Sequence, residues 1–187
     1  MGALYVKQLA EKTHRGLRGR VEAGCSGGGN SYGYKVVRET RDGQLEVGMR
    51  AVNPSQAEVV RRIYRVYALG EAPRAIARAL NKEGIPGPSG GTWGPSTTNG
   101  NALRGTGILN NELYVGKLVW NRLKYVKNPN TGKRQSRHNS ADAWILKVVP
   151  DLRNVPQELW DAVKVRQARM ARNTRPGDLQ QSCHSER

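Results

Sequence analysis

Apolar residues recur at intervals of three and four along residues 54–69, and this spacing predicts an amphipathic helix. Its apolar face consists of Val59, Val60, Ile63, Val66 and Tyr67. Asn53 is suited to cap the start of the helix, with Pro54 as its first residue and Gln56 as the second partner of a capping box. Gly70 fits the position just beyond the last turn.

A second helix follows closely. It is predicted to begin at Pro73, because proline is favoured at the first helical position, and to end at Gly84. Its inward-facing residues are Ile76, Ala77 and Leu80. Ala72 stands at the cap position, where its methyl side chain cannot accept a hydrogen bond.

A third helical segment is predicted from Pro95 to Arg104, after a loop rich in proline and glycine. Almost every side chain in this segment is short and forms hydrogen bonds. Its few apolar anchors are Trp93, Leu103, Ile108 and Leu109. Two short helices followed by a polar third one are the layout of a helix-turn-helix, here a variant because its connecting loop is long.

Both ends of the chain carry further predicted elements. Residues 4–21 favour a basic helix with few apolar positions, which is typical of a connecting element. A last helix is predicted to begin at Pro156 and to reach residue 172, with Leu159, Trp160 and Val163 on one face. The polar tail, 173–187, is expected to be disordered.

Four short strands complete the prediction. Residues 32–38 and 45–49 flank Asp42-Gly43 and favour a β-hairpin. Residues 114–121 and 144–149 are predicted strands on either side of a basic loop that contains Asn128-Pro129-Asn130-Thr131-Gly132. The expected fold class is therefore α+β: a small helical bundle with a helix-turn-helix variant and short antiparallel strands.

Charge gives the first indication of function. The 187 residues include 31 Lys and Arg against 15 Asp and Glu, a net charge of +16. Such a surplus favours a polyanionic partner, and duplex DNA is the leading candidate over RNA or a merely solvated basic surface. No apolar run is long enough for a membrane span. Cys25 and Cys183 lie far apart without a secretion signal, which favours a reduced, cytoplasmic setting.

The polar third segment supplies the candidate DNA contacts. Asn and Arg side chains can bind adenine and guanine edges through paired hydrogen bonds, so the candidate base readers are Asn99, Asn101 and Arg104. Short hydroxyl side chains near a helix start suit phosphates, so the candidate phosphate contacts are Ser96, Thr97 and Thr98. The alternative is that Asn99 and Asn101 are capping or turn residues in an irregular loop.

Basic and flexible segments outside the helix-turn-helix provide further candidates. The additional residues expected to contact DNA are Arg15, Arg18, Arg20, Asn30, Lys124, Lys127, Lys133 and Arg134. Asn30 belongs to the glycine-rich stretch 24–33, which lacks the order of a phosphate-binding P-loop. This stretch is either a pliable strip along DNA or a plain linker.

No catalytic constellation is present in the sequence. His14, His138 and His184 lie in unrelated contexts without a nucleophile and acid nearby, and no cysteine pair has metal-binding spacing. We therefore expect no enzymatic activity from this chain by itself, no metal and no cofactor.

Several blocks in order resemble the recombinase domain of the large serine recombinases. These blocks are residues 28–34, 59–64, 76–86 and 108–116, together with Trp93. The resemblance runs from about Lys7 to Gln167. It implies an interdomain linker helix over 1–22, a DNA-binding domain over 23–155 and a C-terminal helix of that domain over 156–172.

The resemblance also implies a function. In that family a separate resolvase-like domain supplies the catalytic serine and a zinc ribbon follows the recombinase domain, and neither is expected in this chain. We expect a sequence-specific duplex-DNA-binding module that recognises an attachment site and is monomeric off DNA, although full-length relatives form dimers and tetramers. The alternative is a free-standing helix-turn-helix transcription regulator, which would need a dimer and a palindromic operator.

Overall fold

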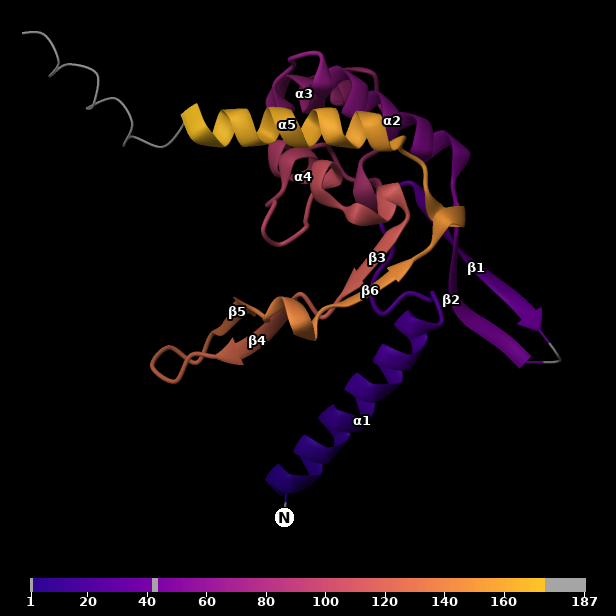
Figure 1. The fold of residues 1–187 in the computed structure, drawn as a ribbon, viewed down its shortest axis with the longest axis vertical. Coiled ribbons are helices and arrows are strands. Elements are labelled where there is room, and N and C mark those ends of the chain that lie inside the picture. The colour runs from indigo at the N-terminus through magenta and orange to yellow at the C-terminus, as the bar shows by residue number, and fades with distance from the viewer. Residues whose placement is uncertain (1, 42–43, 174–187) are drawn as a thin grey trace, which may run out of the picture.

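The computed structural model describes residues 2–41 and 44–173, which form an α+β fold with projecting arms (Figure 1). The helices are α1 (Gly2–Glu22), α2 (Pro54–Ala68), α3 (Pro73–Lys82), α4 (Pro95–Asn99) and α5 (Gln157–Asn173). The expected fold class is confirmed. The Asp42-Gly43 turn and the tail beyond Asn173 lie outside the described residues, and Asn173 itself still belongs to α5.

The strands form three separate antiparallel pairs. They are β1 (Tyr34–Arg41) with β2 (Gln44–Val52), β3 (Lys117–Trp120) with β6 (Ile145–Val148), and β4 (Leu123–Lys127) with β5 (Arg134–His138). The β3–β6 pair begins later than predicted, because Glu112–Val115 forms a 3-10 turn that ends at Gly116. The basic loop, predicted to have no regular structure, is a second hairpin.

The ends of α2 follow from the residues predicted there. Asn53 Oδ1 accepts a hydrogen bond from the Gln56 backbone N–H, and Gly70 lies just beyond the helix with a φ of +122°. The prediction of a capping box, however, is wrong. The Asn53 N–H donates to the Gly33 carbonyl, and the Gln56 side chain instead accepts from the Gly33 N–H at 3.0 Å. Both bonds therefore tie the start of α2 to the start of the β1 hairpin.

Three buried tyrosines connect parts of the body that are distant in sequence. Tyr64 belongs to α2, Tyr34 to β1 and Tyr114 to the 3-10 turn before β3. Tyr34, Tyr64 and Tyr114 are almost completely buried, and each hydroxyl donates to a backbone carbonyl distant in sequence. The Tyr64 hydroxyl, for example, lies 2.8 Å from the Ile108 carbonyl oxygen. Burial raises the pKa of all three phenols, so they remain neutral donors at physiological pH. These bonds fix the segment after α4 against the core.

Two cations fix α5 across the bundle. Arg166 donates to the Tyr67 and Glu71 carbonyls at the end of α2 and stacks over the Tyr67 ring at 4.2 Å, which satisfies carbonyl groups that the helix leaves free. Lys164 donates to the Leu109 carbonyl at 2.8 Å and to the Asn110 side chain at 2.7 Å. Burial lowers the pKa of Lys164 to about 8. Helix α5 therefore positions both α2 and the segment after α4.

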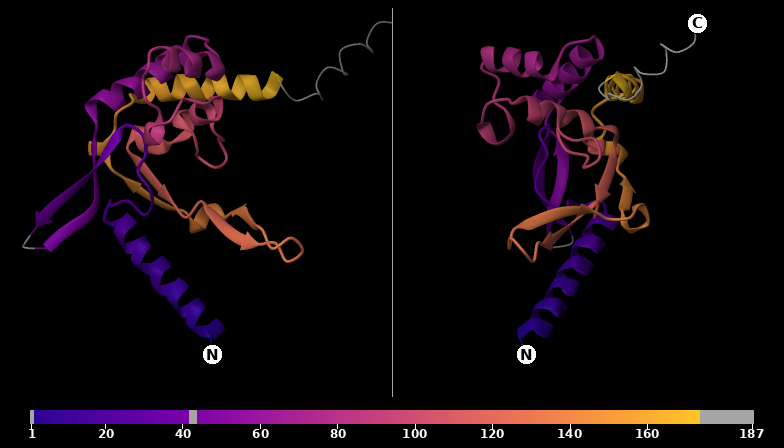
Figure 2. Two further views of the ribbon diagram at one scale, coloured as in Figure 1. Left: turned by 180° about the vertical axis from the view of Figure 1, so that it is seen from behind. Right: turned by 90° about the vertical axis from the view of Figure 1, so that its left-hand side faces the viewer.

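Helix α1 stands away from this body (Figure 2). Its C-terminal half is anchored, because Val21 is fully buried and the His14 ring lies 4.7 Å from the Trp120 ring. Tyr5 is 67% exposed. The helix continues without interruption through Gly16 and Gly19.

Candidate nucleic-acid interface

Helix α4 is much shorter than predicted, because it ends at Asn99 instead of Arg104. Gly100 takes φ +57° and ψ −144°, a conformation that breaks the helix and that residues with a Cβ rarely adopt. A Cβ built on Gly100 would lie 1.8 Å from the Thr106 carbonyl oxygen. The chain therefore turns back on itself directly after α4.

Residues 101–106 form a tight turn, which we call the reading turn. Asn101 and Thr106 exchange two backbone hydrogen bonds of 3.1 Å, and Asn101 Oδ1 accepts from the Arg104 N–H at 3.0 Å. Asn101 is thus a turn residue, as the alternative to base reading expected. Arg104 is exposed, and Leu103, predicted to be an apolar anchor, is 75% exposed. The turn presents Arg104 outward from its tip.

The predicted phosphate contacts on α4 separate into two groups. Ser96 is exposed and Thr97 is partly exposed. Thr98 was expected to contact DNA, and this is wrong: its side chain is completely buried and its hydroxyl faces the Gly94 carbonyl at 3.4 Å. Asn99 remains exposed, while its backbone carbonyl accepts from the Asn110 side chain at 2.5 Å.

Two adjoining clefts lie beside the reading turn, and both are lined by Ser31, Gly105 and Asn111. One, of about 320 Å³, also includes Ser96 and Thr97. The other, of about 230 Å³, is lined by Arg104 and by residues 26–29 of the glycine-rich stretch. We call the two clefts together the shared groove. It brings α4, the reading turn and the glycine-rich stretch together.

Arg50, which the sequence analysis did not single out, holds the glycine-rich stretch in place. Its guanidinium donates to Ser26 Oγ at 2.5 Å and to the Gly29 carbonyl. Burial lowers the pKa of Arg50, although the residue remains a cation at any physiological pH. The Asn30 side chain donates to the Tyr34 carbonyl at 2.6 Å, which fixes the end of the same stretch.

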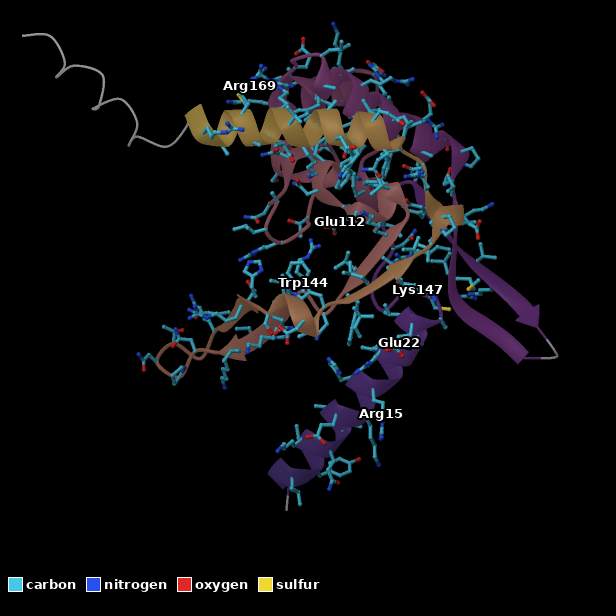
Figure 3. The ribbon with its side chains drawn as sticks, in the orientation of Figure 1. Arg15, Glu22, Glu112, Trp144, Lys147 and Arg169 are labelled. Atoms are coloured by element: carbon cyan, nitrogen blue, oxygen red, sulfur yellow. The ribbon has the colours of Figure 1, made fainter. Side chains whose placement is uncertain are left out.

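Arg122, which was also not predicted from the sequence as a functional residue, supports the reading turn. Its side chain is only 10% exposed and donates to both Glu112 carboxylate oxygens, at 2.8 and 2.6 Å. The guanidinium also lies 4.7 Å from the Trp144 ring centre. Gly105 has a φ of +64°, and a Cβ there would lie 1.7 Å from Arg122 Nη1, so a larger residue would strain the backbone and displace the guanidinium. In Figure 3, Glu112 is seen near the loop after α4 and Trp144 near the base of the β4–β5 hairpin.

The other predicted contacts lie outside the shared groove. Arg15 is exposed on α1, and Arg18 on the same helix pairs with Glu22 at 2.8 Å. Arg20 packs against Gly48 of β2. Lys124, Lys127, Lys133 and Arg134 are exposed on the β4–β5 hairpin. The predicted residues therefore lie on α1, on the hairpin and in the groove, except that Thr98 is buried and that the groove lining does not include Asn30, Asn99 and Asn101.

Residues 2–41 and 44–173 contain no group of three or more His, Cys, Asp or Glu side chains placed to hold a metal ion. None of the helices in these ranges combines the length and the apolar character that a membrane crossing requires.

Comparison with known proteins places the chain. The structure is similar to a solved structure described as "Crystal Structure of a LSR-DNA Complex", with a TM-score of 0.50 and 19% sequence identity. The similarity covers 86% of this chain but only 40% of that chain, and at this identity it shows the fold alone. No curated protein matches the sequence. Residues 54–170 match the family model named Recombinase, which confirms the resemblance to the large serine recombinases. Because this match covers more than half of its residues, the chain belongs to the Recombinase family.

Proposed function

We propose that this chain is the sequence-specific duplex-DNA-binding domain of a site-specific serine recombinase, acting on an attachment site in the cytoplasm. The observation that carries the proposal is the shared groove, where α4, the reading turn and the glycine-rich stretch face one another. Its exposed polar groups belong to short side chains, to Arg104 and to Lys117, a composition that suits base edges and phosphates.

Base reading is assigned to Arg104, and phosphate contact to Ser96 and Thr97, because these residues line the shared groove. Asn99 instead lines a separate cleft beside α5, and Asn101 holds the turn through its side-chain oxygen. A five-residue helix can present few side chains, so the reading turn replaces the missing second half of a recognition helix. Arg104 at its tip can donate two hydrogen bonds to guanine O6 and N7. The net charge of +16 supplies the attraction that brings the domain to DNA.

The chain is proposed to bind DNA without cutting it. His14 contacts Trp120 and Asn121, and His138 is exposed on β5, so neither is part of an arrangement that could activate a nucleophile. Strand cleavage and exchange would belong to a larger recombinase of which this chain is a part.

The affinity for duplex DNA is expected to depend steeply on salt. If about six phosphates are neutralised, the logarithm of the binding constant should fall against the logarithm of the salt concentration with a slope near −5. Fluorescence anisotropy with a labelled duplex at several salt concentrations measures this slope. A flat response would contradict DNA binding through this basic surface.

Arg104→Ala is expected to cost about 1–3 kcal/mol on a preferred site selected from random duplexes, because a bidentate contact to guanine is lost. The loss should be small on unrelated duplexes, so that specificity relaxes at one base pair. Titration of both kinds of duplex checks this. Arg78→Ala, an exposed arginine on α3 outside the groove, is the matched control. An equal loss on every sequence would reassign Arg104 to phosphate contact.

A further inference from the structure

The β4–β5 hairpin, residues 123–138, is an isolated two-stranded arm that we call the ribbon. It projects from the body on the side opposite to the β1–β2 hairpin (Figures 1 and 2). Only Leu123, Asn128 and Ser136 are partly buried, and Tyr125 is 61% exposed. A two-stranded arm that packs on nothing is only marginally stable in water. Its sequence therefore has to be explained by something outside this chain.

The strand register of the ribbon places like charges directly opposite each other. Lys124 pairs with Arg137, and Lys127 pairs with Arg134. Directly opposed like charges destabilise a strand pair. Residues 123–138 contain no Asp or Glu, and no salt bridge joins these four cations to any carboxylate among the described residues. Arg134 lies over the Tyr125 ring at 4.9 Å and Arg137 donates to Gln135 at 3.4 Å, but no negative charge among the described residues offsets the repulsion, as expected for an arm that binds a polyanion.

The ribbon is nevertheless held in a defined shape at both ends. At the tip, Asn128 accepts at its side-chain oxygen from the Asn130 N–H at 2.9 Å and at its carbonyl from the Gly132 N–H at 2.8 Å. At the base, Asn139 donates to the Asn121 carbonyl at 2.8 Å and accepts from the Trp144 indole at 3.1 Å. This order reduces the entropy that binding would otherwise cost.

Strand geometry distributes the two cation pairs over opposite faces. Lys124 and Lys127 are three residues apart, and side chains alternate along a strand, so the pairs Lys124–Arg137 and Lys127–Arg134 point to opposite sides. A partner that satisfies both faces at once must have two rows of negative charge with a gap between them. The major groove of B-DNA is about 12 Å wide, admits a two-stranded ribbon and has a phosphate row along each wall.

We propose that the ribbon lies in the major groove of duplex DNA, with one cation pair facing each phosphate backbone. This inference rests on the proposed function and assigns Arg137, which the sequence analysis did not include, to the DNA contact. The minor groove, about 6 Å wide, is too narrow for a ribbon. The major groove of A-form RNA is deep and narrow, so double-stranded RNA does not fit either.

The test reverses charge on one strand of the ribbon. In Lys124→Glu/Lys127→Glu each like pair becomes a Glu–Arg pair, so the ribbon should gain stability while it loses affinity for DNA. The matched control is Lys35→Glu/Arg38→Glu on β1. It has the same spacing and charge change on exposed residues of the other hairpin, opposite Ala51 and Val47.

Binding to a mixed-sequence B-form duplex of about 30 base pairs is measured by anisotropy from low to moderate salt. The ribbon variant should bind about 10–100-fold more weakly at low salt, with a salt slope shallower by about 2–4, because up to four phosphate contacts are lost. Its thermal midpoint should be unchanged or higher by about 1–4 °C. The control should change the slope by less than about 1.

Two results would overturn the ribbon assignment while leaving the proposed function intact. One is equal weakening by the ribbon and control variants, which would show that only net charge matters. The other is a lower thermal midpoint of the ribbon variant together with its weaker binding, which would show a structural role. Failure of the unchanged protein to bind the duplex at low salt would instead defeat the proposed function.

A modified duplex tests the groove. Bulky sugars attached at cytosine C5 project into the major groove, where the thymine methyl group lies. They should weaken binding of the unchanged protein by a larger factor than that of the ribbon variant, in which only the contact of the reading turn remains to be obstructed in that groove. Equal weakening of both, or competition by double-stranded RNA as strong as that by DNA, would overturn the placement of the ribbon in the major groove.

Discussion

Gly100→Ala is expected to lower the free energy of unfolding by about 3 kcal/mol or more. At φ +57° and ψ −144° a residue with a Cβ is strained by about 1–3 kcal/mol. The new methyl group would also lie 1.8 Å from the Thr106 carbonyl oxygen and 2.3 Å from its carbon, so the reading turn has to open. Equilibrium unfolding in urea, followed by tryptophan fluorescence, measures the loss.

Gly28→Ala is the matched control for this prediction. Gly28 is exposed and does not have a positive φ, and a methyl group added there would meet no other atom within 4 Å. The substitution should therefore change stability by less than about 0.5 kcal/mol. If Gly100→Ala were as mild as Gly28→Ala, residues 100–106 would not form the turn described above. The proposed contact of Arg104 with DNA would then also lose its structural basis, because that turn positions Arg104.

The helices of the body could be predicted from sequence because each is specified locally. The stripe from Val59 to Tyr67 marks one buried face, and Pro54 and Gly70 mark the ends of α2. Helix α3 likewise runs between the predicted limits, although Ala72 caps it without a side-chain hydrogen bond. In both helices the spacing of the buried apolar residues and the prolines and glycines at the ends indicate the same helix. Such agreement makes a prediction from local sequence reliable.

The segment after α4 could not be predicted in the same way, because distant groups decide its structure. Polar residues tolerate both helix and turn, so Asn99 and Asn101 were compatible with either. The choice is made by Asn110, whose side chain binds the Asn99 and Thr106 carbonyls, and by the close contact between Gly100 and Thr106. The burial of Thr98 follows from the same fold-back and has no local signal.

The ribbon escaped prediction for a different reason. A half-buried strand shows itself by alternating apolar and polar positions, but β4 and β5 are exposed on both faces and carry cations on both. The sequence indicated only a loop, through the turn residues Asn128 to Gly132. A strand pair that is exposed on both faces and carries cations on both therefore has the sequence pattern of a basic linker.

Arg122→Met is expected to lower the free energy of unfolding by about 2–4 kcal/mol. The change keeps the apolar stem of the side chain but removes two hydrogen bonds to Glu112 and the stacking on Trp144. Removal of one partner from a buried ion pair leaves the other charge uncompensated, which costs about 3–5 kcal/mol when burial is complete. Glu112 retains 32% exposure, so a somewhat smaller loss is expected.

Two further variants separate the ion pair from general packing. Arg18→Met breaks the exposed Arg18–Glu22 pair on α1 and should cost less than about 0.5 kcal/mol. Adding Glu112→Gln to Arg122→Met removes the uncompensated carboxylate and should recover about 1–2 kcal/mol. No recovery in the double variant would mean that packing of the Arg122 stem against Gly105 and Trp144, and not the ion pair, holds the reading turn. Recovery would show that a charge pair invisible to local sequence patterns positions both the reading turn and the base of the ribbon.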